Sequence, residues 1–433
     1  MSAEHFRIGI AQVEITPEHN VELSGFALRQ QPSAGVLDPL FVRALRVQSA
    51  GAELLWLHCD LLAVDEALVA RFRRWAGDKF GLEPGQVLLT ATHTHSGPAT
   101  VPLRAAGAPD GHYLEQLDEK LRSAAEMARM RNEECTLVSV EEMLSLAVHR
   151  RGPATAHVDP RVAALGFKRR DGTFAAVVVN YAIHPVALGH SNRAVSADLP
   201  GAVALALSRQ LPGQPVVLFA NGACGNLNPP GENVPWSRVQ EWGNQFAALL
   251  APALQRARPA PPTLRLARRI VPLPLDYLDR TALDAAVAST LATVPDEGFG
   301  RRVRDCVHGW GDDLRRELAE GRAAQRREAE LHLVQIGDCV FVGVNAEVFS
   351  IFTDWLRRDT GLAKVYTLGY ANGDMGYLCT RPAYAEGGYE VDMAHIFYGG
   401  YRFRIGALEQ LADEAAAAIA RLPAPALSAT AAT

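Results

Sequence analysis

Residues 86–98 read QVLLTATHTHSGP, an apolar run that leads directly into two histidines. The run from Gln86 to Thr92 is short and uncharged, which predicts a buried strand. Alternate residues of a strand share a face, so the His93 and His95 imidazoles are predicted to point into one cleft. Imidazole is a common zinc ligand, but an isolated His-x-His pair is about as often a structural feature of a core or surface.

Outward from this stretch, apolar runs of strand length alternate with segments of helical periodicity. Predicted strands cover 7–16, 40–49, 53–62, 86–92, 136–142, 174–181, 215–220, 331–344 and 364–368. Predicted helices cover 65–80, 113–130, 199–211, 239–256, 349–358 and 404–422, and Asp65 stands at the N-cap position of the first. This alternation indicates an α/β fold with mixed β-sheets flanked by helices.

Three further polar clusters follow predicted strands, where α/β folds build their sites. His184 follows the strand that ends at Tyr181, Glu347 follows the strand that ends at Val344, and Tyr377 closes the segment Gly373–Tyr377. Each has a structural explanation when taken singly: a satisfied buried histidine, an acid near a helix N-terminus and a core aromatic residue.

Composition narrows the function classes. The 433 residues carry 43 basic and 48 acidic side chains, a net charge of -5, which argues against a nucleic-acid partner. No apolar run reaches the length of a membrane span, and the first residues lack a signal-peptide pattern. The 6 cysteines form no Cys-x-x-Cys pair, so reduced buried thiols are expected. We therefore expect a cytoplasmic protein without stable membrane association, acting on a small-molecule substrate; the sequence leaves open whether it forms a homo-oligomer.

The chain is predicted to form a single catalytic domain over residues 1–422. The charged, helix-rich segment at about 281–328 is predicted to be a helical insertion, a hairpin lying across the sheet that shapes the pocket. Residues 423–433 are small and apolar without a core to bury, so a flexible tail is expected there.

The segment His93-Thr94-His95-Ser96-Gly97-Pro98 resembles the signature of the neutral/alkaline non-lysosomal ceramidases. Further segments match that family in the same order, from about Gly9 to about Tyr401. The resemblance implies the fold of the family's N-terminal catalytic domain, and no C-terminal immunoglobulin-like domain is expected. It also implies that Zn²⁺ is bound by His93, His184, Glu347 and Tyr377.

The same resemblance implies that His95, Arg150 and Tyr389 surround the carbonyl of the substrate. Arg150 lies in His149-Arg150-Arg151, and Tyr389 follows Tyr377 at the spacing of the family. One position departs from the family: Asn228 stands where the family has a functional serine. An amide cannot act as a serine-type nucleophile, although it can donate a hydrogen bond to an oxyanion.

Two neighbouring features have open interpretations. Asp60 and Asp198 either orient the imidazoles as hydrogen-bond partners or serve as turn formers and helix caps. The glycines of Gly222–Gly225 are interpreted as positions where the backbone approaches the site closely.

The sequence hypothesis is thus a zinc-dependent amidohydrolase that uses a metal-activated water to cleave an amide bond, linear or cyclic, of a small soluble N-acyl substrate. Ceramide itself is doubtful as the substrate, because no membrane-docking surface or secretion signal is recognised. Two alternatives stay open: a zinc-dependent esterase or lactonase, and a non-catalytic binding protein on the same scaffold. Neither the substrate nor a second, structural metal can be read from the residues.

Overall fold

Two β-sheets pack face to face in the computed structural model, which describes residues 5–152 and 157–423. The larger sheet has the order β4-β3-β2-β1-β5-β7-β8-β9, with β11 (Pro259–Ala260) paired to β5. Its strands are β1 (Phe6–Glu14), β2 (Phe41–Ser49), β3 (Ala52–Cys59), β4 (Val87–Ala91), β5 (Glu133–Met143), β7 (Arg161–Arg169), β8 (Phe174–Tyr181) and β9 (Val216–Asn221). β4 runs parallel to β3 and β9 runs parallel to β8, whereas the pairs from β3 to β8 are antiparallel.

The second sheet has the order β12-β13-β14-β16. It consists of β12 (Leu264–Pro274), β13 (Arg326–Ile336), β14 (Cys339–Val344) and β16 (Val365–Leu368), and only its β14–β16 pair is parallel. A shared apolar core joins the two sheets, in which Trp56 of β3 meets Phe341 of β14 edge to face.

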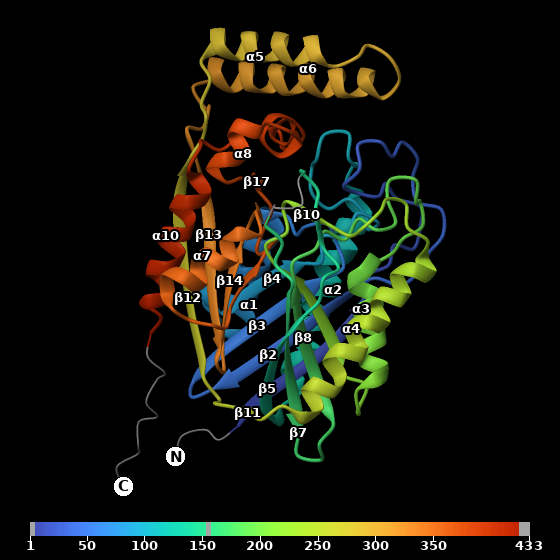
Figure 1. Cartoon of the computed structure of the whole chain (residues 1–433), viewed down its shortest axis with the longest axis vertical. Coiled ribbons are helices and arrows are strands. Elements are labelled where there is room, and N and C mark those ends of the chain that lie inside the picture. The colour runs from blue at the N-terminus through green and yellow to red at the C-terminus, as the bar shows by residue number, and fades with distance from the viewer. Residues whose placement is uncertain (1–4, 153–156, 424–433) are drawn as a thin grey trace.

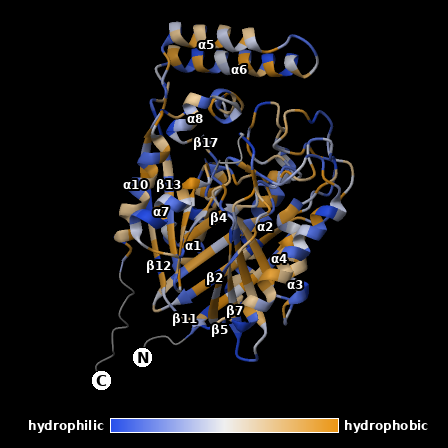
Figure 2. Cartoon of the chain, viewed as in Figure 1, coloured by the Kyte–Doolittle hydropathy of each residue, from blue (hydrophilic) through white to orange (hydrophobic). Residues whose placement is uncertain are grey.

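Helices cover the outer face of each sheet (Figure 1). α1 (Glu66–Phe80), α2 (Gly111–Met130), α3 (Asp198–Gln210) and α4 (Trp236–Arg256) cover the larger sheet, and α7 (Ile351–Thr360) and α10 (Ala407–Ala420) cover the second. Because each helix packs on a sheet with one face only, its residues are mixed in hydropathy, whereas apolar residues are concentrated on the strands (Figure 2). The predicted class, mixed sheets flanked by helices, is confirmed.

The helical insertion is a hairpin, but it does not lie across a sheet. α5 (Arg280–Thr293) and α6 (Gly298–Ala319) stand at one end of the molecule, beyond α8 (Arg381–Glu386) (Figure 1). Three hydrogen bonds fix α6 to the loops beneath it: the Trp310 indole donates to the Gly400 carbonyl, Arg302 donates to the Ala105 carbonyl, and Arg104 donates to the Asp313 carboxylate. The hairpin therefore covers the loops that contain Ala105 and Gly400. After the hairpin, the chain returns to the second sheet at β13.

Several strands differ from the prediction. β7 and β12 are additional, and the strand predicted over 331–344 is two antiparallel strands joined by a turn at Gly337. Gly166 weakens the sequence pattern of β7, because glycine is uncommon inside strands. Glycine is required there, since a side chain at this position would collide with the Phe174 ring. β12 contains two prolines and several arginines, which an edge strand tolerates.

Two sequence expectations concern the ends of the chain and membranes. The predicted tail, from residue 424 on, lies outside the described residues. Among the helices of residues 5–152 and 157–423, none combines the length and apolar character that crossing a bilayer requires.

Candidate active site

Three sequence-predicted metal ligands follow the ends of strands that meet at one edge of the fold. His93 follows β4, His184 follows β8, and Glu347 opens the two-residue strand β15 (Glu347–Val348) after β14. The fourth, Tyr377, opens β17 (Tyr377–Leu378), which pairs parallel with β15 so that Glu347 and Tyr377 are direct neighbours in register. The structure therefore brings together residues from four distant segments.

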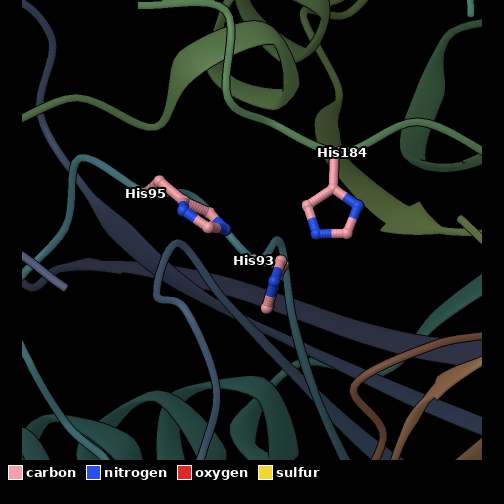
Figure 3. Close-up of side chains that lie close together, drawn as sticks. All are labelled: His93, His95 and His184. Carbon is pink, nitrogen blue, oxygen red and sulfur yellow. The ribbon is translucent and has the colours of Figure 1, made fainter. Parts of the chain in front are cut away.

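His93 and His95 do not lie in a strand, because β4 ends at Ala91. His93 has a φ of 61°, in the left-handed region, and this turn places its ring 4.9 Å from the ring of His95 (Figure 3). Such a backbone costs a non-glycine residue about 1–3 kcal/mol and is found where surrounding contacts hold it. Tyr370 supplies one such contact by stacking on His93 with a centroid distance of 3.7 Å.

Backbone carbonyls orient the imidazoles of His93 and His184. His93 Nδ1 lies 2.8 Å from the Leu62 carbonyl oxygen, and His184 Nδ1 lies 2.9 Å from the Cys224 carbonyl oxygen. A carbonyl oxygen only accepts hydrogen bonds, so each Nδ1 carries the proton and each Nε2 presents a lone pair to the site. This is the usual orientation of metal-binding histidines.

Both lone pairs face one carboxylate oxygen. Glu347 Oε2 lies 3.5 Å from His93 Nε2 and 3.0 Å from His184 Nε2, and all three residues are buried. The Nε2 atom of His184 has no hydrogen-bond partner within the described residues. Lone pairs at this distance repel unless a cation lies between them. Tetrahedral ligands about 2.1 Å from a Zn²⁺ ion are about 3.4 Å apart, so the spacing fits such an ion.

His95 lies beside this group. Its ring centroid is 5.7 Å from that of His184, and neither of its buried ring nitrogens has a partner in the described part of the chain. Burial holds the pKa of His95 well below its usual value, and the neighbouring His93 adds to the effect, so the ring is neutral at neutral pH. Arg29, which the sequence analysis missed, fixes this loop by donating to the His95 carbonyl at 2.9 Å.

Arg150, Asn228 and Tyr389 line the same cavity of 360 Å³. Arg150 Nε donates to Glu390 at 2.7 Å, while its Nη2 is buried and unpartnered among the described residues. The Asn228 side chain likewise has a buried oxygen without a partner, and amide oxygen and nitrogen can exchange places by a flip. Three groups that can donate hydrogen bonds thus border the space next to the three histidines.

The remaining wall of the cavity is apolar. Its side chains come from the loop near residue 26, from α6, from the segment that ends in α9 (Ala394–Tyr398) and from three further loops. They are Phe26, Leu28, Leu62, Leu103, Val186, Phe299, Val303, Met393 and Phe397. The hairpin therefore supplies part of the pocket through Phe299 and Val303, as the sequence analysis predicted for this segment.

The open interpretations are also settled. Asp60 does not orient an imidazole but accepts from Arg43 Nη1 at 2.8 Å, and Asp198 accepts from the Leu199 backbone N–H at the start of α3. The glycine interpretation is confirmed, because a Cβ on Gly225 would lie 2.7 Å from the Glu347 carbonyl oxygen. Tyr398 and Asp374 near Glu347 were not predicted; Asp374 belongs to a polar cluster that the sequence displays, whereas Tyr398 lies in no recognisable motif.

Fold and site together define an α/β protein with a candidate metal centre at the strand ends, beside a mainly apolar cavity. No model of a known protein family matches the chain. The neutral ceramidase of Pseudomonas aeruginosa is 24% identical over 457 residues, which cover 89% of this chain and 68% of that protein.

Two solved structures share the fold. The crystal structure of the Pseudomonas aeruginosa neutral ceramidase matches with a TM-score of 0.75 and 20% identity, over 97% of this chain and 75% of that chain. A structure of ceramidase complexed with C2 matches with the same TM-score and identity, over 97% of this chain and 76% of its own. This chain is therefore neutral-ceramidase-like in sequence and in fold, and the resemblance noted from its motifs is confirmed.

Proposed function

We propose that this protein is a zinc-dependent hydrolase that cleaves the amide bond of a substrate with an apolar N-acyl group. The observation that carries the proposal is the pair of imidazole lone pairs facing Glu347 at the edge of an apolar cavity. The relative named as a neutral ceramidase supports hydrolysis of an amide carbon–nitrogen bond. The apolar wall favours a hydrocarbon acyl group over the freely soluble substrate that the sequence suggested.

His93, His184, Glu347 and Tyr377 are the residues that would hold the ion. When bound there, Zn²⁺ supplies Lewis acidity and lowers the pKa of coordinated water toward neutrality. Burial raises the pKa of the Tyr377 phenol, and the Arg150 guanidinium, 5.3 Å from the centre of that ring, acts in the opposite direction. Arg150 therefore supports Tyr377 as a ligand in addition to its role toward the substrate.

The substrate carbonyl is placed between the ligand group and the hydrogen-bond donors. Arg150 Nη2 and the Tyr389 hydroxyl donate to the carbonyl oxygen, and the Asn228 amide is a third donor as negative charge develops there. An unpartnered ring nitrogen of the neutral His95 accepts a proton from the attacking water and returns it to the leaving nitrogen. Because Asn228 is not a nucleophile, water attacks the carbonyl directly and no acyl-serine forms.

Replacing Tyr389 by phenylalanine is expected to lower kcat about 100-fold with little change in KM, since one oxyanion donor is worth about 3 kcal/mol in the transition state. Steady-state kinetics on a chromogenic N-acyl amide measures the change. Tyr277→Phe is the matched control, because Tyr277 lies outside the cavity and packs on Tyr401. A Tyr389→Phe variant with unchanged kcat would remove Tyr389 from the mechanism.

Replacing Val303 by phenylalanine is expected to shorten the acyl chain that the enzyme accepts, because the larger side chain fills the apolar end of the cavity under α6. Each excluded methylene costs about 0.8 kcal/mol, or roughly fourfold in kcat/KM. Rates for amides with two to twelve acyl carbons test this. The acetyl amide serves as the internal control, and an unchanged chain-length profile would show that Val303 does not border the acyl group.

Elemental analysis of the purified protein, followed by a matched series of amides and esters, tests the function as a whole. We expect about one Zn²⁺ per chain and turnover of apolar N-acyl amides. Turnover of the esters without turnover of any matched amide would instead favour the esterase alternative. A zinc-loaded protein that hydrolyses nothing in either series would support the binding-protein alternative.

We also propose a cytoplasmic location. All 6 cysteines are free and buried, which agrees with a reducing compartment. Immunoblotting of fractionated cells checks the location.

A further inference from the structure

Tyr398, the last residue of α9, connects two acidic side chains near the candidate metal centre. Its hydroxyl oxygen lies 2.6 Å from Glu347 Oε1 and 2.9 Å from Asp374 Oδ2. Asp374 is held in turn, because its Oδ1 accepts from the Gly376 backbone N–H at 3.0 Å. The three residues come from different segments, and the Tyr398 hydroxyl, which has a single proton to donate, lies within hydrogen-bond distance of both carboxyl groups.

The two oxygens of Glu347 have different neighbours. Oε2 faces the Nε2 atoms of His93 and His184, whereas Oε1 receives the short hydrogen bond from Tyr398. A carboxylate held in this way offers one oxygen to a cation, and the other oxygen is occupied. Without the Tyr398 hydroxyl, Oε1 loses its donor, and the longer hydrogen bond from the Tyr370 hydroxyl to Oε2, at 3.3 Å, is left to hold the carboxylate.

We propose that Tyr398 is a positioning residue that holds Glu347 in one-oxygen coordination geometry, and that Asp374 fixes the Tyr398 hydroxyl in place. This inference rests on the proposed metal-dependent function and adds two residues that the motif resemblance did not supply. Hydrogen-bond partners of metal ligands typically contribute 10–100-fold to metal affinity or activity. Tyr398 belongs to α9, which lies beneath α6. The helical hairpin is therefore physically connected to the proposed ligands.

Tyr398→Phe isolates the hydroxyl from the ring. The ring packs against Gly376, where a Cβ would lie 3.2 Å away, and phenylalanine keeps that packing. We expect Zn²⁺ affinity, measured by competition with a chromogenic chelator, to fall 10–100-fold. We also expect the visible spectrum of the Co²⁺-substituted protein to change, because a freed carboxylate alters the coordination number.

Tyr384→Phe is the matched control. Its hydroxyl donates to the Phe403 backbone carbonyl at 2.7 Å and contacts none of the proposed ligands. The same loss of one tyrosine hydroxyl is expected to leave Zn²⁺ affinity and the Co²⁺ spectrum unchanged. A Tyr398→Phe variant that matches the Tyr384→Phe variant in both measurements overturns the inference.

Asp374 needs its own test, because its carboxylate lies within 4.8 Å of the ligand atoms of His93 and Glu347 and is close enough to be a ligand itself. Asp374→Asn keeps a polar partner for Tyr398, so we expect a smaller loss of Zn²⁺ affinity than in Tyr398→Phe. A larger loss than in Tyr398→Phe would assign Asp374 as a ligand and overturn its role as a support. A wild-type protein that binds no Zn²⁺ contradicts the proposed function, whereas unaltered binding by Tyr398→Phe contradicts only this inference.

Discussion

Replacing His93 by alanine is expected to remove the bound zinc and to lower hydrolytic activity by far more than the 10–100-fold typical of partners behind a ligand. The Nε2 of His93 is one of two imidazole lone pairs aimed at the site, and its Nδ1 bond to Leu62 leaves no other ring orientation. Alanine at this position leaves too few ligands for a stable tetrahedral centre. Elemental analysis and turnover of an N-acyl amide measure both losses.

The control is His112→Ala, which removes an exposed histidine from the first turn of α2. That variant is expected to keep zinc and activity, and a circular-dichroism melt of each variant checks folding. Full zinc occupancy and full activity in a folded His93→Ala protein would show that the ligand assignment is wrong.

Replacing Arg73 by methionine is expected to lower the free energy of unfolding by about 3 kcal/mol, the lower end of the cost of removing one partner from a buried ion pair, because Arg268 still pairs with Glu330. Arg73 of α1 donates to both oxygens of Glu330, at 2.6 and 2.9 Å, and both side chains are largely buried. The pair joins α1 to β13, and without it the buried Glu330 carboxylate keeps Arg268 Nη2, at 2.8 Å, as its cationic partner. Urea denaturation measures the change.

Arg170→Met is the matched control, because its ion pair with Glu134 lies on the surface and is worth about 0–1 kcal/mol. Equal losses in the Arg73 and Arg170 variants would show that the buried pair contributes no more than a surface pair.

The same pair predicts how stability depends on pH. Burial by itself raises the pKa of Glu330, but hydrogen bonds from His332 and Arg73 outweigh it and hold the pKa well below the usual value. A carboxyl whose pKa is lower in the folded state stabilises the protein above its unfolded pKa of about 4.3, and that stability is lost as the pH falls. Between pH 5 and 3, the wild type should therefore lose more stability than Arg73→Met.

Local patterns were sufficient for much of the fold. Apolar runs of strand length and helical periodicity are properties of neighbouring residues, so the alternation of strands and helices, including the Asp65 cap of α1, could be predicted. The same holds for the polar clusters after β4, β8 and β14, since strand ends are recognisable in sequence. β12 shows where this fails: its prolines and arginines are tolerated because it is an edge strand, a property of the sheet rather than of the segment.

The candidate site could be described only by combining the sequence with the tertiary structure. The sequence alone, through its motifs and their order, predicted which side chains belong to the site, and the structure brings three of them, His93, His184 and Glu347, close together. Only the tertiary structure decided that backbone carbonyls orient the imidazoles, that α6 roofs the cavity and that Tyr398 reaches Glu347. These features are contacts between segments remote in the chain, and their geometry depends on how the sheets and loops pack, which no local pattern of residues encodes.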